Sequence, residues 1–227
     1  MRKALFGLAA ILLAAMAFTG CGNAAGGTGA PGLPAATATT ARGVKAYFDE
    51  GHTIVYFVGD LVLGSGAGEE AVLDVPSGKT LILADLADLN SRAVSASGKG
   101  SITVKTGGTL NVTSAKLVVP NGTKVTVAAG TGTVNLTGAA TVIVGTPGVV
   151  PAAADAPVFA IKGGTVTASS TATLSFTSGA TLEKSGGTLT AASGTAFAFE
   201  DPADLDTTVV EAIAAAGSTA LNVGGTI

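Results

Sequence analysis

The chain has 227 residues, with 12 basic and 15 acidic side chains and a formal net charge of −3. This balance excludes the basic stripe of a nucleic-acid-binding protein, so we expect no nucleic-acid partner. The chain has a single cysteine, which excludes an intrachain disulfide. It also has a single histidine, and these two residues are too few for a zinc ligand set. We therefore expect no metal and no other cofactor.

The N-terminus has the pattern of a signal peptide. Arg2 and Lys3 form a positive start, and residues 4–18 are apolar apart from Gly7. Fifteen residues are too few for a helix to cross a ~30 Å hydrocarbon core comfortably, which favours a cleaved signal over a permanent span.

The quartet Phe18, Thr19, Gly20 and Cys21 resembles a bacterial lipobox, with Phe18 where leucine is more usual. The resemblance implies cleavage before Cys21 and acylation of that cysteine, which would anchor the mature protein in a membrane. Gly22 in place of an aspartate implies the outer membrane or the cell surface. We expect residues 1–20 to be the signal peptide.

We expect residues 21–41 to be a lipidated cysteine followed by a flexible tether. Residues 22–40 carry no charge and consist mainly of Gly, Ala, Thr and Pro, a composition typical of linkers. Removal of Arg2 and Lys3 with the signal peptide leaves ten basic residues against 15 acidic ones. The folded part is expected to begin near Arg42.

Short apolar segments recur along residues 98–200, and their leading positions are seven to nine residues apart. Within each pair the apolar residues alternate with small or polar ones, which is the period of a half-buried strand. The segments are Ile102/Val104, Leu110/Val112, Leu117/Val119, Val125/Val127, Val134/Leu136, Val142/Val144, Val150, Val158/Ala160, Val166, Leu174/Phe176, Leu182, Leu189 and Phe197/Phe199.

This pattern predicts an all-β fold, specifically a parallel β-helix (β-solenoid) with a short C-terminal capping helix. The near-constant spacing and the repeated turns 107–109, 163–165 and 186–188, each Gly-Gly-Thr, favour stacked coils over a β-sandwich, which remains the alternative. Three segments of about eight residues would make one coil of about 24 residues, as in a three-faced β-helix.

A solenoid needs caps at both ends. We assign residues 42–97 to an N-terminal cap and irregular coils, with Leu61/Leu63, Leu73/Val75 and Leu81/Leu83 pointing inward and Tyr47, Phe48, Tyr56 and Phe57 packing over the first coil. Residues 201–227 form the C-terminal cap. There Asp206 and Gly217 would bound a helix whose buried stripe is Val209, Val210, Ile213 and Ala214.

Few side chains suggest chemistry. Asp155 and Glu183 are the only acids between residues 97 and 199, and a paired-carboxylate hydrolase would need them within ~5–10 Å of each other. We interpret them as solvated acids, and His52 as a surface or cap residue without a nucleophile. The segment 64–68 is read as a turn rather than a phosphate loop. The acids Glu200, Asp201, Asp204 and Asp206 are expected to solubilise the cap and start its helix.

Outward-facing threonines and the aromatic residues of the repeat suggest two further kinds of binding surface. The pairs Thr165/Thr167, Thr171/Thr173 and Thr188/Thr190 could stack into a hydroxyl-methyl array like that of ice-binding solenoids, although threonine is also a good strand former. Carbohydrate binding would need exposed aromatics, whereas Phe159, Phe176, Phe197 and Phe199 are expected to point inward.

The repeat resembles those of adhesin-like solenoids in architecture and composition. With no catalytic residue assigned, the sequence favours a non-enzymatic, lipid-anchored surface or envelope lipoprotein whose solenoid contacts host or envelope macromolecules. The alternative is an extracellular protein that binds or degrades polysaccharide. Cys21 is the one site residue that the sequence assigns.

Overall fold

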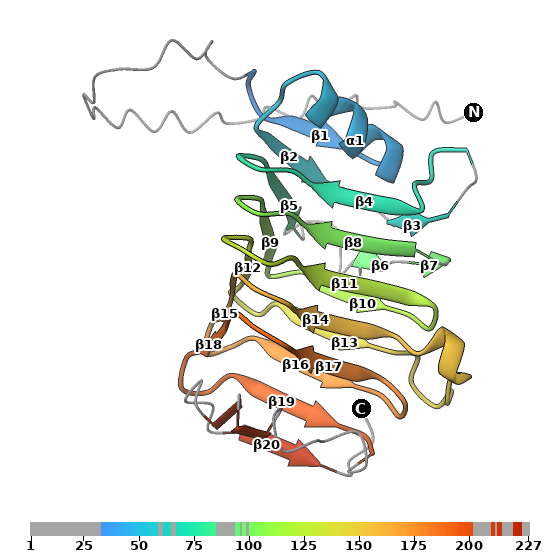
Figure 1. Cartoon of the computed structure of the whole chain (residues 1–227), viewed down its shortest axis with the longest axis vertical. Helices are drawn as coiled ribbons and strands as arrows, with labels where there is room; N and C mark the ends of the chain where they lie inside the picture. Colours follow the sequence, from blue (N-terminus) through green and yellow to red (C-terminus); the bar gives the residue numbers. More distant parts are fainter. Residues whose placement is uncertain are drawn as a thin grey trace, which may run out of the picture. The chain divides into compact units, whose positions relative to one another are not determined.

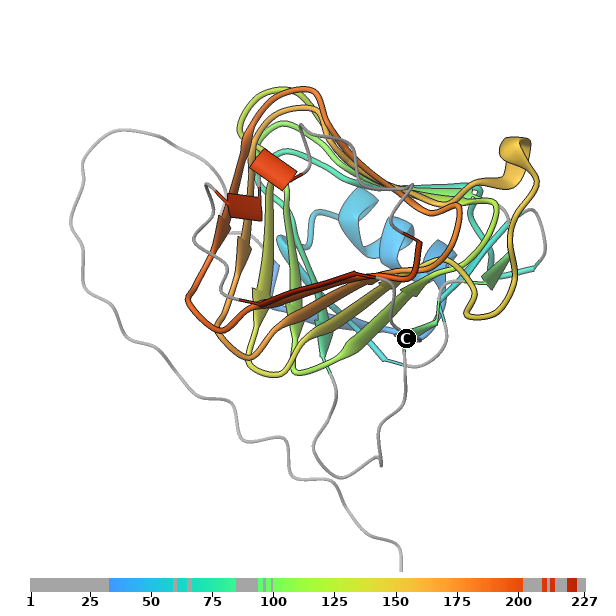
Figure 2. The ribbon, with the colours of Figure 1, turned by 90° about the horizontal axis from the view of Figure 1, so that it is seen from below.

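The computed structural model describes residues 33–58, 61–64, 67–84, 94–95, 97–98, 100–201, 210–211, 213–214 and 220–223. The expected signal peptide and Cys21 lie outside these residues. In the described part the chain winds into a stack of coils, and all pairs of neighbouring strands in the sheets are parallel (Figure 1). Seen along the stack, the coils enclose a roughly triangular cross-section (Figure 2). The prediction of a three-faced parallel β-solenoid is confirmed.

Each face of the triangle is one parallel sheet, and from β8 to β19 successive strands of the chain go to successive faces. The seven-stranded sheet has the order β1-β2-β5-β9-β12-β15-β18, and its strands are Ala36–Ala38, Ile54–Phe57, Thr80–Ala84, Thr109–Thr113, Thr133–Thr137, Thr165–Ala168 and Thr188–Ala191. The five-stranded sheet comprises β4 (Val72–Val75), β8 (Gly100–Val104), β11 (Thr123–Val127), β14 (Val158–Ile161) and β17 (Thr181–Lys184). The six-stranded sheet comprises β6 (Val94–Ser95), β10 (Lys116–Val119), β13 (Thr141–Val144), β16 (Thr173–Phe176), β19 (Ala196–Phe199) and β20 (Ala220–Val223). A short pair joins β3 (Val62–Leu63) to β7 (Ser97–Gly98).

The register confirms a coil of about 24 residues. Thr109 pairs with Thr133, and Thr165 pairs with Thr188, at separations of 24 and 23 residues. The coil between them is longer, because Thr133 pairs with Thr165. The extra residues form an excursion over residues 145–157 that includes the 3₁₀ turn Ala153–Asp155, after which the chain resumes the same register.

The core runs along the axis and is built by alternate residues of every face. The inward pairs expected from the sequence are buried, from Leu61/Leu63 to Phe197/Phe199, with two exceptions. The assignment of Val150 was wrong, because this residue lies in the excursion and is 74 % exposed. The pair Val158/Ala160 was out of phase by one residue. Phe159 and Ile161 fill the axis there, since they are in register with Val125 and Val127.

The repeated glycines lie at the corner between the five-stranded and seven-stranded sheets, where they contact the backbone of the preceding coil. Gly164 has φ of +66°, and a Cβ there would collide with the carbonyl oxygen of Gly132 on the preceding coil. Gly187, one coil further, has the same φ and would place a Cβ 2.6 Å from the carbonyl carbon of Gly163. Glycine is therefore required twice over at this corner, by the backbone conformation and by the backbone-to-backbone contact.

A helix closes the N-terminal end of the stack. Helix α1 (Ala41–Asp49) buries Ala41, Val44 and Phe48 against the first coils, and Tyr47 packs against the same core. The sequence predicted aromatic packing at this end but not a helix. The folded part was predicted to begin near Arg42, whereas β1 already pairs with β2 inside the segment predicted to be a tether. Phe57 is buried as expected, and Tyr56 instead points outward.

In the expected C-terminal cap, the structure describes helical residues at 210, 211, 213 and 214 and the strand β20, which pairs with β19. Ile213 is buried in the core, as expected, but Val210 and Ala214 are exposed, so the predicted four-residue stripe was wrong at these two positions. Val209 and the expected helix boundaries Asp206 and Gly217 lie outside the described residues. No helix among the described residues is long and apolar enough to span a membrane.

Candidate functional site

The outward side of the seven-stranded sheet is the most regular surface of the solenoid. Because inward and outward residues alternate, the register places outward residues of successive strands in columns parallel to the axis. One column consists of Ile54, Thr80, Thr109, Thr133, Thr165 and Thr188. The next consists of Thr37, Tyr56, Ile82, Asn111, Asn135, Thr167 and Thr190. We call these two columns together the threonine face.

Side-chain hydrogen bonds tie neighbouring coils together on this surface. The Asn135 side-chain amide donates to Oδ1 of Asn111 at 2.8 Å. Next to the columns, at the ends of the same two strands, Oγ1 of Thr137 donates to Oγ1 of Thr113 at 3.1 Å. Each bond links residues that are paired in the sheet, so the outward side chains of β9 and β12 are held in matching orientations.

The threonine face differs from the expected threonine pairs in two respects. Thr165/Thr167 and Thr188/Thr190 do stack on it, since β15 and β18 are neighbours. Thr171/Thr173 does not: Thr173 belongs to the six-stranded sheet, and the Thr171 hydroxyl donates to the carbonyl oxygen of Gly138 at 2.6 Å. The sequence analysis missed the matching positions in β5, β9 and β12, although an outward threonine at each strand start was the available signal.

No strand of the seven-stranded sheet contains a charged residue. The strands of the five-stranded sheet do contain charges, at Asp74, Lys124, Glu183 and Lys184. Asp74 there forms an ion pair with Lys105, with 3.3 Å between Oδ2 and Nζ. The threonine face is therefore electrically neutral along its length, while a neighbouring face of the solenoid is not.

The candidate carboxylate pair is not assembled on one strand or column. The carbonyl oxygen of Asp155 accepts a hydrogen bond from the Gly122 amide at 2.7 Å, so this residue sits against the coil that precedes β14. Glu183 lies on the coil that follows β14, paired with Ala160. The two residues therefore belong to successive coils, Asp155 before β14 and Glu183 in β17.

His52 has structural contacts at the N-terminal end. Its Nδ1 lies 2.6 Å from the carbonyl oxygen of Pro34, and its ring meets Tyr47 edge-on at 5.2 Å between centroids. Lys79 Nζ donates to the carbonyl oxygen of His52 at 2.8 Å. These contacts join the first strand, the helix and the second coil, in agreement with the interpretation of His52 as a cap residue.

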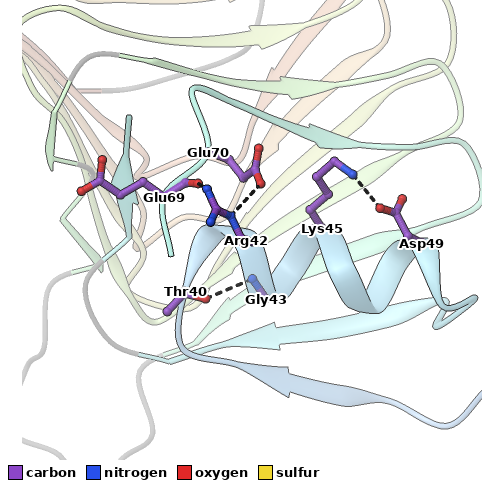
Figure 3. A network of polar contacts seen from close by, with 7 residues as sticks. All are labelled: Thr40, Arg42, Gly43, Lys45, Asp49, Glu69 and Glu70. Atoms are coloured by element: carbon purple, nitrogen blue, oxygen red, sulfur yellow. Dashed lines mark hydrogen bonds and ion pairs between the residues drawn. The ribbon is translucent and has the colours of Figure 1, made fainter. Parts of the chain in front are cut away.

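The remaining charged residues of this end hold α1 in place (Figure 3). Thr40 caps the helix by accepting from the Gly43 amide at 3.0 Å, and Arg42 contacts Glu70 at 3.4 Å and the carbonyl oxygen of Glu69 at 3.1 Å. Lys45 donates to Asp49 at 2.6 Å, and this hydrogen bond raises the pKa of Lys45. The bond's contribution to stability is thus present at neutral pH and lost only as the pH rises through that raised pKa.

The last two candidate segments also have structural surroundings. In the segment 64–68, the Gly68 carbonyl oxygen accepts from the Arg42 amide at 3.1 Å, and the Gly64 amide donates to the Glu70 carbonyl oxygen at 3.1 Å. These bonds support the interpretation as a turn at Ala67 and Gly68; Ser65 and Gly66 lie outside the described residues. Glu200 accepts from the Ser178 amide at 3.1 Å, whereas Asp204 and Asp206 are not described.

The four phenylalanines of the repeat are buried, as expected. Phe176 and Phe199 stack in parallel, with 4.8 Å between centroids. Tyr56 is the aromatic side chain that stands on the threonine face, with 39 % of its surface exposed.

Comparison of the chain with protein-family models, curated proteins and solved structures gives no match.

Proposed function

We propose that this protein is a lipid-anchored bacterial lipoprotein that presents its β-solenoid at the outer membrane or cell surface for adhesion or for envelope structure. The observation that carries the proposal is the stack of coils in constant register, which gives a rigid rod with long continuous faces. Such rods suit contact with extended partners, because every coil repeats the same surface.

The anchoring part of the proposal rests on the lipobox-like quartet that ends at Cys21. Two or more acyl chains on one cysteine would hold a protein of this size stably, whereas one chain gives marginal binding. The first described residue, Leu33, follows Cys21 by only twelve positions, so the rod would be held near the bilayer.

The alternative of polysaccharide degradation receives less support. Hydrolysis by paired carboxylates needs both groups on either side of one glycosidic bond. Asp155 belongs to the excursion before β14, whereas Glu183 belongs to β17 of the next coil, so the two carboxylates share neither a strand nor a column. Binding of polysaccharide without hydrolysis requires no such pair.

Protease treatment of intact cells tests the proposal. We expect the wild-type protein to incorporate labelled palmitate, to fractionate with membranes and to be shaved from intact cells. Cys21→Ala should lose the label and leave the membrane, while Asn23→Ala, a matched change two residues away, should behave as wild type. A membrane-bound, unlabelled Cys21→Ala protein would contradict lipid anchoring. Protection of the wild type until the envelope is opened would contradict surface display.

A further inference from the structure

The threonine face combines three properties that together restrict its partner. The first is neutrality: none of the seven strands carries a charge, although other strands of the solenoid do. Nucleic acids, acidic polysaccharides and anionic lipid surfaces are all recognised through basic side chains. The neutrality of this face therefore argues against an anionic partner and favours an uncharged one.

The second property is an ordered set of hydrogen-bonding groups. Five consecutive strands place a threonine in the same column, and Asn111 and Asn135 occupy neighbouring positions of the next column. The bond between the two amides uses only part of their capacity, since each carboxamide has two donor hydrogens and an acceptor oxygen. This bond orients the two asparagine side chains before a ligand arrives, so little of their side-chain entropy is lost on binding.

The third property is an apolar end with an exposed aromatic ring. Tyr56 lies in the same column as Asn111, with Ile82 between them, and Ile54 leads the threonine column. Tyr56 and Ile54 are 39 % and 37 % exposed. A tyrosine ring offers an apolar surface with a polar tip, which suits the C–H face of a sugar ring bordered by hydroxyls.

We propose that the threonine face binds a neutral linear polysaccharide lying along the solenoid axis. Threonine and asparagine side chains would hydrogen-bond its hydroxyls, and Tyr56 would stack on one sugar ring. From β1 to β18 the face spans six strand spacings, ~29 Å, which accommodates several sugar units. This inference deepens the proposed function, on which it rests, by naming the chemistry of the partner that the displayed rod contacts.

Co-sedimentation of the purified chain with insoluble cellulose, chitin, starch and mannan tests the inference, with calcium pectate gel as the anionic comparison. We expect retention on at least one neutral polysaccharide and none on pectate. Thr167→Lys places a charge on the face, on the strand next to β18, and should weaken binding about tenfold or more, because the ammonium group must be desolvated. Thr181→Lys is the matched control: it too changes an exposed strand threonine, but on the five-stranded sheet, and it should bind as wild type.

Far-UV circular dichroism of both variants confirms that each is folded, and Tyr56→Ala gives a second, independent loss of affinity. Retention on none of the neutral polysaccharides, or an equal loss with Thr181→Lys, overturns the inference. Ice shaping and freezing hysteresis without sugar binding also overturn it, and identify ordered water as the partner instead. These assays use no membrane, so they fail or succeed separately from the cell-shaving test of the anchor.

Discussion

Replacing Gly164 with alanine should destabilise the solenoid by more than the backbone conformation alone requires. A residue other than glycine in the left-handed region costs roughly 1–2 kcal/mol. A Cβ at this position also meets the carbonyl oxygen of Gly132, and forcing an extra methyl into packed structure typically costs ~1–3 kcal/mol. We therefore expect a total of about 2–5 kcal/mol.

Gly78→Ala is the matched control for this prediction. Gly78 has φ of +72°, close to that of Gly164, but a Cβ there meets no atom within 4 Å. It should cost only the conformational ~1–2 kcal/mol. Melting followed by circular dichroism measures both variants, with each kcal/mol lowering the midpoint by about 2–4 °C in a domain of this size. Equal midpoints for the two variants would refute the argument that coil-to-coil contact requires glycine at this corner.

Three further predictions concern the core and the two ends. Phe176→Ala removes one ring of the stacked pair with Phe199 and should lower the free energy of unfolding, measured in urea, by about 3–5 kcal/mol. Phe176→Leu leaves a smaller cavity and should lower it clearly less; equal losses for the two variants would argue against a cavity. Thr40→Ala removes the cap of α1 and should cost about 1 kcal/mol, while Thr40→Ser restores it; a stable Thr40→Ala protein would show that the cap is dispensable. Lys184 lies on β17, the terminal strand of the five-stranded sheet, in register with the inward residues Val127 and Ile161. A charge at such an inward position discourages the exposed edge of the sheet from pairing with a second copy of the chain. Lys184→Val should therefore elute as larger species in gel filtration as concentration rises, unlike the exposed-site control Lys162→Val; unchanged elution would contradict this role.

The solenoid was predictable because its repeat leaves signals at every coil. Alternation in segments such as Leu110/Val112 identifies half-buried strands, and the Gly-Gly-Thr turns mark one corner three times. The phase failed at Val158/Ala160, where Val158, Phe159, Ala160 and Ile161 are all apolar and alternation gives no direction. Only the neighbouring strand, with Val125 and Val127 inward, decides it.

The ends were less predictable because they do not repeat. Helix α1 begins at Ala41 after an alanine-threonine segment that, by composition, resembles a linker, and only its cap at Thr40 marks the start. The excursion 145–157 keeps an apolar residue, Val150, at the expected spacing while leaving the stack. The threonine face was found in part from Thr165/Thr167 and Thr188/Thr190. Its full extent depends on strand register, which the sequence alone does not specify across the longer coil.

The parallel register also has a consequence for how the chain reaches its folded state. Each strand pairs with the strand one coil earlier, so the sequence separation of its partners stays between 19 and 35 residues among the described strands. A newly synthesised segment can therefore dock on the coil already formed, without waiting for the distant C-terminus. Helix α1 would supply the surface on which the first coil forms, and the rod would then grow coil by coil toward its C-terminal end.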